Sequence, residues 1–267
     1  MRLGVLDVGS NTVHFLVVDA HQGGRPLPVF SHKAELHLGD SLEEGNRLSR
    51  GTAMRLRAFV AEALQIAEDK GVEELLAFAT SAVRDATNGD DVLASIRSAT
   101  GVDIAALPGP EEARLTFLAV RRWFGWSSGK VLMLDIGGGS LEIAVGIDEV
   151  PDVTISLPLG AGRLTRDWLI GDPPSADETR QLRRHVRAEI ARRAGPGHLR
   201  DSPGDLGTHV AAQLPDLLRG RRVAGEPVPG EPRRTQRQGD GHVGLFVDAR
   251  RDLQGAAADV DHEHAPR

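Results

Sequence analysis

The sequence predicts an α/β protein composed of two similar halves, each beginning with a strand, a tight glycine turn and a second strand. In Lys130–Gly146 an apolar run ends at Asp135, three glycines follow, and a second apolar run continues. The stretch Leu3–Asp19 shows the same pattern 128 residues earlier, so that Asp7 takes the position of Asp135. Two such turns at matching depth in apolar strands predict duplicated domains that face one another across a cleft.

The turn Gly137–Gly139 has the composition of a phosphate-binding site. Glycines adopt positive φ angles and let a ligand approach the backbone, and their N–H groups can form a concave anion site. Asp135 and Glu142 flank the turn, and Mg²⁺ is commonly bound by one or two carboxylates together with phosphate oxygens. The alternative is a glycine-rich hairpin without a ligand, because short glycine motifs also occur for structural reasons alone.

Composition argues against several classes of protein. The chain of 267 residues carries a formal net charge of −6 at pH 7, which disfavours a nucleic-acid or anionic-membrane surface. It has no cysteine, which excludes disulfides, thiolate metal sites and thiol nucleophiles. No apolar run approaches the roughly 18 residues of a membrane span, and the N-terminus lacks a signal-peptide pattern. We therefore expect a cytoplasmic protein without nucleic-acid or membrane partners.

The first half reads as a three-stranded meander followed by alternating helices and strands. Predicted strands cover residues 2–8, 12–19, 27–37, 74–79 and 103–107, and predicted helices cover residues 56–67, 90–100 and 110–124. Leu56, Val60 and Leu64 recur at helical spacing. Pro110, with acids in the same turn, suits a helix N-terminus.

The second half repeats the meander and then departs from the first. Predicted strands cover residues 130–136, 140–147 and 152–158, a turn covers 159–162, and predicted helices cover 163–169 and 176–193. We accordingly expect a first domain at 1–125, the first part of a second domain at 126–191, and a tail at 192–267, so that the second domain is incomplete.

Three antiparallel strands followed by alternating helices and strands, twice over, resemble the duplicated actin-like ATPase (ribonuclease H-like) fold. Four motifs make the sequence similar to one family within it, the exopolyphosphatase / guanosine pentaphosphate phosphohydrolase family. They are Asp7-Val-Gly-Ser-Asn-Thr12, Thr80-Ser-Ala-Val-Arg-Asp-Ala86, Gly109-Pro-Glu-Glu-Ala-Arg-Leu115 and Asp135-Ile-Gly-Gly-Gly-Ser-Leu-Glu142. The resemblance covers about residues 1–190.

This resemblance implies a hydrolase that releases terminal orthophosphate from inorganic polyphosphate with Mg²⁺, or alternatively Mn²⁺. The second substrate that it implies is guanosine pentaphosphate, which would lose its 5′ γ-phosphate, and the shared motifs do not separate the two. A homodimer is compatible with it. A protein of another class, an inactive fragment that binds phosphate, is the further alternative.

Matching the motifs position by position implies the site residues. Glu112 matches the catalytic glutamate, which would orient and deprotonate water. Asp135 and Glu142 match the metal-associated acids, and Asp7 would face them from the first half. The residues that match the phosphate-binding turns and an arginine are Gly9, Ser10, Asn11, Arg84, Gly137, Gly138, Gly139 and Ser140.

The acidic residues also have structural interpretations. Glu111 and Glu112 both suit the positive end of a helix dipole. Adjacent helical residues point about 100° apart, so only one of the two can face the cleft. Glu142 could be a solvated strand residue, although it lies in an apolar run. His14 takes the corresponding position in the first half, and we interpret it as a packed strand residue.

For the arginines the alternatives are ion pairs and solvated surface. Arg84 could hold a phosphate through two parallel hydrogen bonds, or it could pair with Asp85 or Asp90. We interpret Arg121 and Arg122 as part of a solvated helix face rather than as a basic track for a polymer.

The tail from residue 192 onwards departs from the family pattern. It is rich in arginine, glycine and proline, contains no lysine, and shows little helical or strand periodicity outside Val210–Leu218. A GC-rich gene translated in a shifted reading frame produces this kind of sequence. A divergent linker or disordered tail is the alternative.

Overall fold

The structure is a computed structural model that describes residues 1–24, 26–198 and 243–248, with only the backbone described for 194–198 and 243–248. Contacts within the chain separate two units, Met1–Pro108 and Gly109–Arg267. The helix at 109–124 therefore groups with the second unit, whereas the predicted domain boundary followed residue 125.

A five-stranded sheet with the order β3-β2-β1-β6-β7 forms the first unit. Its elements are β1 (Arg2–Val8), β2 (Thr12–Asp19), β3 (Leu27–Glu35), β4 (Leu42–Glu43), β5 (Arg47–Leu48), α1 (Arg50–Asp69), β6 (Glu74–Ala79), α2 (Ser81–Arg84), α3 (Gly89–Thr100) and β7 (Ala105–Ala106). β1, β2 and β3 are antiparallel, and β6 is parallel to β1. The predicted meander is confirmed, the strand predicted at 103–107 is shorter, and the β4–β5 hairpin was not predicted.

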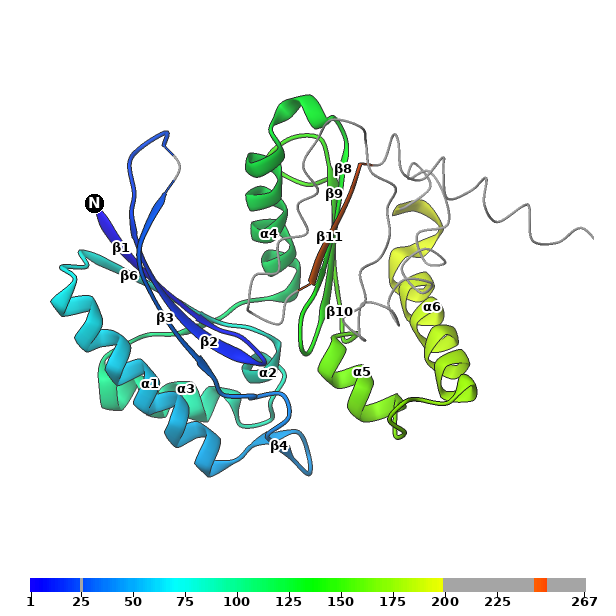
Figure 1. Ribbon diagram of the computed structural model, residues 1–267, viewed down its shortest axis with the longest axis horizontal. Coiled ribbons are helices and arrows are strands. Elements are labelled where there is room, and N and C mark those ends of the chain that lie inside the picture. Colours follow the sequence, from blue (N-terminus) through cyan, green and yellow to red (C-terminus); the bar gives the residue numbers. More distant parts are fainter. Residues whose placement is uncertain (25, 199–242, 249–267) are drawn as a thin grey trace, which may run out of the picture. The chain divides into compact units, whose positions relative to one another are not determined.

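Helix α1 and the sheet share the main core of the first unit, and α1 and α3 lie side by side in Figure 1. The Ser49 hydroxyl accepts a hydrogen bond from the Thr52 amide at 3.1 Å and caps the helix. Leu56 and Val60 of α1 are fully buried in the cluster that also contains Phe15. Burying each such side chain contributes about 1.5–3 kcal/mol.

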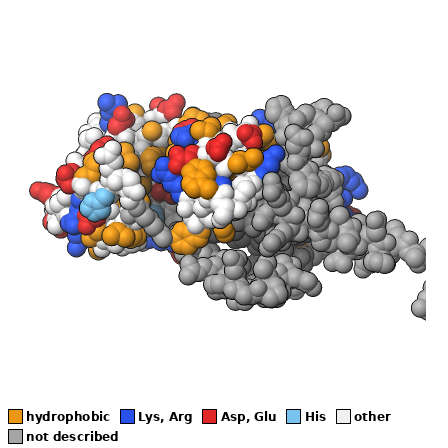
Figure 2. All heavy atoms as spheres, turned by 90° about the horizontal axis from the view of Figure 1, so that it is seen from above, with side chains coloured by type: hydrophobic (Ala, Val, Ile, Leu, Met, Phe, Trp, Pro, Cys, Tyr) orange, Lys and Arg blue, Asp and Glu red, His pale blue; other side chains and the backbone are white. Residues whose placement is uncertain are grey.

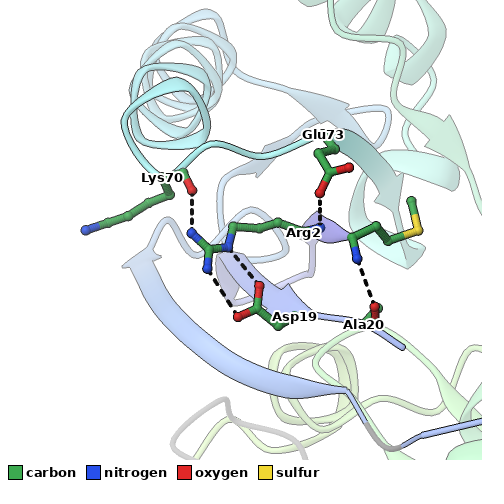
Figure 3. Close-up of polar contacts among 6 residues, drawn as sticks. Arg2, Asp19, Ala20, Lys70 and Glu73 are labelled. Carbon is green, nitrogen blue, oxygen red and sulfur yellow. Dashed lines mark hydrogen bonds and ion pairs between the residues drawn. The ribbon is translucent and has the colours of Figure 1, made fainter. Parts of the chain in front are cut away.

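The Arg2 guanidinium connects three segments at the start of the first sheet (Figure 3). Its Nε and Nη2 donate to the two carboxylate oxygens of Asp19, at 2.8 and 3.1 Å, and its Nη1 donates to the Lys70 carbonyl at 2.8 Å. The Arg2 amide donates to the Glu73 carboxylate at 2.7 Å. One residue thus joins the first strand to the end of the second and to the loop after α1.

We predict that Arg2→Ala lowers the melting temperature by a few degrees, because Asp19 and the Lys70 carbonyl lose their partner. Arg2→Lys should restore only part of the loss, since an ammonium group cannot make the two parallel bonds to a carboxylate. Thermal unfolding followed by circular dichroism measures this, with Arg57→Ala on the exposed face of α1 as control. Melting curves of Arg2→Ala and Arg57→Ala that coincide would contradict the prediction.

The second unit is a four-stranded sheet with the order β10-β9-β8-β11, covered by helices on both faces (Figure 1). Its elements are α4 (Gly109–Phe124), η1 (Trp126–Ser128), β8 (Val131–Ile136), β9 (Leu141–Gly146), β10 (Val153–Leu157), α5 (Ala161–Trp168), α6 (Ala176–His198) and β11 (Val243–Asp248). The predicted second meander and the helix at 110–124 are confirmed.

Alternate residues of β8 pack against different helices. Leu132 and Leu134 belong to the cluster formed with α5 and α6, whereas Met133 packs with Phe117 of α4 and with Ala144. Because both faces are covered, β8 and β9 are apolar along almost their whole length. The acid of β9, Glu142, is accordingly buried.

The buried Arg121 corrects one interpretation made from the sequence. Its side chain is almost fully buried, with the residue 1% exposed, and donates to the carbonyls of Gly129 at 2.7 Å and Trp126 at 3.1 Å. The chain turns back over the end of α4 at this point, and the carbonyls of that turn require a donor. The prediction of a solvated helix face is wrong for Arg121, whereas Arg122 is exposed and pairs with Glu149.

Side chains of both charges stand beside hydrophobic ones on the face drawn in Figure 2. Large exposed apolar residues also occur at the end of α4 and in η1, where Trp123 and Trp126, respectively, are about half exposed. No helix in the described part of the chain is long and apolar enough to cross a membrane.

Two described segments fall within the predicted tail. Helix α6 continues to His198, and β11 pairs with β8 in antiparallel orientation, with Gly244 opposite Asp135. The expectation of a tail without regular structure is thus wrong at these segments.

Val243-Gly-Leu-Phe-Val247 is an apolar run, and the edge of β8 offers backbone groups with which it can pair. In the first unit β6 holds the corresponding place but runs parallel to β1. The rest of the predicted tail lies outside the described residues.

Candidate active site

The two predicted glycine turns close with the same hydrogen bond. The Gly9 amide donates to the Thr12 carbonyl at 3.0 Å, and the Gly137 amide donates to the Ser140 carbonyl at 2.9 Å. These positions correspond under the displacement of 128 residues seen in the sequence. The repeat is therefore a repeat of backbone geometry as well as of sequence.

Helix α5 holds the second turn from one side. The amides of Ala161 and Arg163 donate to the carbonyls of Gly137 and Gly138, at 2.8 and 3.1 Å. Gly160 lies so close that a Cβ there would stand 2.3 Å from the Gly139 carbonyl carbon. No side chain fits at this position, so residue 160 must be glycine for the turn to keep its shape.

The backbone N–H groups of this turn suit an anion. Within the described residues the amides of Gly138 and Gly139 donate no backbone hydrogen bond, whereas the carbonyls of Gly137 and Gly138 are occupied. Backbone N–H groups presented in this way can bind phosphate oxygens. The turn therefore has the polarity that the sequence analysis expected of it.

Around the first turn, side chains and backbone from three segments meet. The Ser10 hydroxyl lies 2.8 Å from the Ser81 hydroxyl of α2, and both residues are buried. The Asn11 carbonyl accepts from the amides of Leu36 and His37. Ser10 and Asn11 are thus held in place by neighbouring parts of the first unit.

Arg84, at the end of α2, has the ion pair that the sequence analysis gave as its alternative role. Its Nε donates to Asp85 at 3.1 Å and its Nη1 donates to the Leu107 carbonyl at 3.0 Å. A phosphate-binding role for Arg84 stays a prediction.

Two of the predicted metal-associated acids lie opposite one another on adjacent strands. Asp135 of β8 and Glu142 of β9 are register partners. Both alternate with residues that face α5 and α6, so both side chains belong to the face covered by α4. Glu142 is 1% exposed, which excludes the solvated strand residue considered above. Asp7 lies in the first unit, where its register partner on β2 is His14.

The two acids of α4 differ in their surroundings. Glu111 forms an ion pair with Arg114 one turn further along, and this bond lowers the pKa of Glu111. Glu112 instead lies near enough to Glu142 for its charge to act on that carboxylate. The described second unit thus brings Glu112, Asp135 and Glu142 together, and leaves Glu111 on the side of Arg114.

Burial raises the pKa of Glu142 from its usual 4.5 to about 8, with smaller contributions from the charges of Glu112 and Asp135. Hydrogen bonds from the hydroxyls of Ser140 and Ser156 oppose this rise. Without a cation, the folded chain therefore keeps a proton on Glu142 at neutral pH. A divalent cation would stabilise the ionised form of this buried carboxylate and offset the repulsion from its acidic neighbours.

The acids fit Mg²⁺ only together with oxygens from a ligand. Within the described residues no cluster of three or more His, Cys, Asp or Glu side chains is arranged to hold a metal ion. Asp135 and Glu142 supply two carboxylates, and Mg²⁺ commonly takes one or two of these plus phosphate oxygens. The donor set is therefore that of a metal–phosphate site rather than of a closed protein cage.

We predict that the metal-free chain loses stability as the pH rises from about 5 to 9. The folded state retains the Glu142 proton up to about pH 8, whereas the unfolded chain releases it near pH 4.5, so stability is present at low pH and falls through the folded pKa. Glu142→Gln cannot ionise and should flatten this part of the curve. Melting temperatures in EDTA across this pH range test it, and parallel curves for the two proteins would contradict it.

Sequence reasoning did not identify Ser156 and Gly160 as part of this site. Ser156 was assigned only to a strand and Gly160 only to a turn. Their position at the end of the third strand of the meander could have identified them, because antiparallel pairing brings this end beside Glu142 and the glycine turn.

Two α/β units, each containing a meander with an aspartate before a glycine turn, agree with the duplicated actin-like fold that the sequence predicted. Solved structures of similar proteins agree with this. The exopolyphosphatase of Cytophaga hutchinsonii matches with a TM-score of 0.67 and 26% identity, covering 72% of this chain and 61% of that one. The Ppx/GppA family member of Aquifex aeolicus matches with a TM-score of 0.60 and 25% identity, covering 72% and 62%.

The chain belongs to the Ppx/GppA phosphatase family, which it matches over residues 17–198. It is 56% identical over 191 residues to Exopolyphosphatase 1 of Mycobacterium tuberculosis (strain H37Rv), which covers 72% of this chain and 56% of that protein. It is 33% identical over 158 residues to the guanosine-5′-triphosphate,3′-diphosphate pyrophosphatase of Aliivibrio fischeri, covering 58% and 31%. The chain therefore spans just over half the length of the exopolyphosphatase that it matches.

Proposed function

We propose that the protein is an exopolyphosphatase, a hydrolase that releases terminal orthophosphate from inorganic polyphosphate with Mg²⁺ or Mn²⁺. The observation that carries this proposal is the grouping of Glu112, Asp135 and Glu142 beside a glycine turn whose amides face no backbone acceptor within the described residues. The 56% identity to Exopolyphosphatase 1 supports polyphosphate as the substrate.

In this proposal different residues of the second unit bind the cation and the terminal phosphate. Asp135 and Glu142 would hold the cation, which supplies charge neutralisation on the phosphate oxygens. The amides of Gly138 and Gly139 would hold the terminal phosphate, together with Gly137 and Ser140 of the same turn. For Gly9, Ser10, Asn11, Arg84 and Asp7 of the first unit, the roles that the motifs imply stay predictions.

Glu112 would act on the attacking water. The water oxygen forms a bond to the terminal phosphorus, the phosphoanhydride bond breaks, and the shortened chain leaves with the bridging oxygen. The proton released by the water passes to the Glu112 carboxylate. Glu111 is unsuited to this step because its carboxylate is engaged by Arg114.

We predict that Glu112→Gln lowers kcat on polyphosphate by about 10²–10⁴-fold, because glutamine keeps the shape but cannot accept a proton. Glu111→Gln is the matched control and should lose far less. Phosphate release measures turnover, and polyphosphate binding is measured separately and should persist in both variants. Equal small losses would reduce the pair to helix-terminus charges, and another acid would then be the base.

Guanosine pentaphosphate is the second candidate substrate, supported by the similarity to the Aliivibrio fischeri pyrophosphatase. We predict a higher kcat/KM for phosphate release from long-chain polyphosphate than from guanosine pentaphosphate, assayed side by side on the full chain. A reversed order would favour the nucleotide. Binding of both without turnover, even with excess Mg²⁺, would favour the alternative of an inactive phosphate-binding protein.

A further inference from the structure

A row of three polar side chains crosses the second sheet beneath α4. Asp135, Glu142 and Ser156 are register partners on β8, β9 and β10. The neighbours Leu134, Ile143 and Leu157 pack with α5 and α6, so the three polar side chains share the opposite face. The third member of this row belongs to none of the motifs that define the site in the sequence.

Ser156 makes a direct contact with the buried acid. Its hydroxyl donates to Glu142 Oε1 at 2.8 Å, while the Glu142 side chain is almost completely removed from solvent. A buried carboxylate needs its hydrogen bonds from the protein, because water does not reach it. One Glu142 oxygen therefore has a fixed partner, and the carboxylate has a defined orientation.

The corresponding row of the first unit has a different chemistry. There Asp7 is followed across the strands by His14 and Lys33. His14 Nε2 lies 2.8 Å from the hydroxyl of Ser31 on the third strand. Both units thus place a serine of the third strand against the central residue of the row, but only in the second unit is that residue a carboxylate opposite a second carboxylate.

We propose that Ser156 is a positioning residue that holds the Glu142 carboxylate in the orientation in which it and Asp135 bind the divalent cation. The cation itself rests on the proposed function. Groups that hydrogen-bond a metal ligand orient it, and their loss typically costs about 10–100-fold in metal affinity or activity. Ser156 lies on the segment that also carries Gly160, so the end of β10 positions both the acid and the glycine turn.

The test measures Mn²⁺ binding to the full chain, by the paramagnetic resonance signal of free Mn²⁺, with inorganic phosphate present and without polyphosphate. Ser156→Ala should raise the dissociation constant about 10–100-fold, whereas Ser156→Thr, which keeps the hydroxyl, should stay close to the unmodified chain. Thr154→Ala is the matched control, because it removes a hydroxyl from the same strand opposite Ala144 rather than an acid.

A double-mutant cycle adds a readout that a merely structural role would not move. In the Glu142→Gln background Ser156→Ala should change Mn²⁺ affinity no further, since the residue acts through Glu142. Independent, additive losses would overturn the proposal. If Ser156→Ala does not fold, Ser156→Thr and Ser156→Val make the same comparison, because these two side chains have similar shapes and only threonine carries a hydroxyl.

The remaining outcomes separate this proposal from the proposed function. Unchanged Mn²⁺ affinity in Ser156→Ala, equal losses in the alanine and threonine variants, or no Mn²⁺ binding by the unmodified chain would each overturn the positioning role. Mn²⁺ binding that Ser156→Ala weakens, in a chain that does not hydrolyse polyphosphate, would support the positioning role and remove the exopolyphosphatase proposal alone.

Discussion

The burial of the Glu142 carboxylate is the constraint on which the site of the second unit depends. An ionised carboxylate in an apolar sheet is unfavourable unless hydrogen bonds or an opposite charge compensate it. The hydroxyls of Ser140 and Ser156 donate hydrogen bonds to Glu142, whereas Glu112 and Asp135 add negative charge near it. The local structure is thus arranged at a cost in stability, which is characteristic of sites built to bind a charged ligand.

The two repeats share one backbone geometry but carry different side chains beside the glycine turn. The bond from Gly9 to Thr12 recurs from Gly137 to Ser140, and the aspartate before each turn has the same place on the first strand. At the next position of the row, however, the first unit has His14 and the second Glu142. An imidazole is not a carboxylate, so that row adds no second acid to Asp7, and burial lowers the pKa of His14. The acidic pair is therefore specific to the second unit.

Two kinds of backbone restraint hold the acids and the turn together. Helix α4 packs through Ala113 and Phe117 against Met133 and Ala144, which brings its first turn to the face that carries Glu142. Beside the glycine turn, Gly160 packs against Gly139 without room for a Cβ. Backbone amides of α5 donate hydrogen bonds to the carbonyls of that turn. The side chains of the site therefore depend on packing that lies mostly outside the motifs.

The sequence alone determined the duplication, the meanders, the helix bearing Glu112 and the family, because strand alternation, helical spacing and glycine turns are local patterns. The pattern of acids did not by itself separate Glu112 from Glu111, which only the family resemblance did, since an acid's partner is set by where α4 docks on the sheet. Nor could the sequence find the buried Arg121, whose acceptors lie in the next turn, or the strand at 243–248, which pairs with β8 across more than a hundred residues. Ser156 entered the site for the same physical reason: antiparallel pairing brings it opposite Glu142, and only the tertiary structure decides which strands pair and in which register.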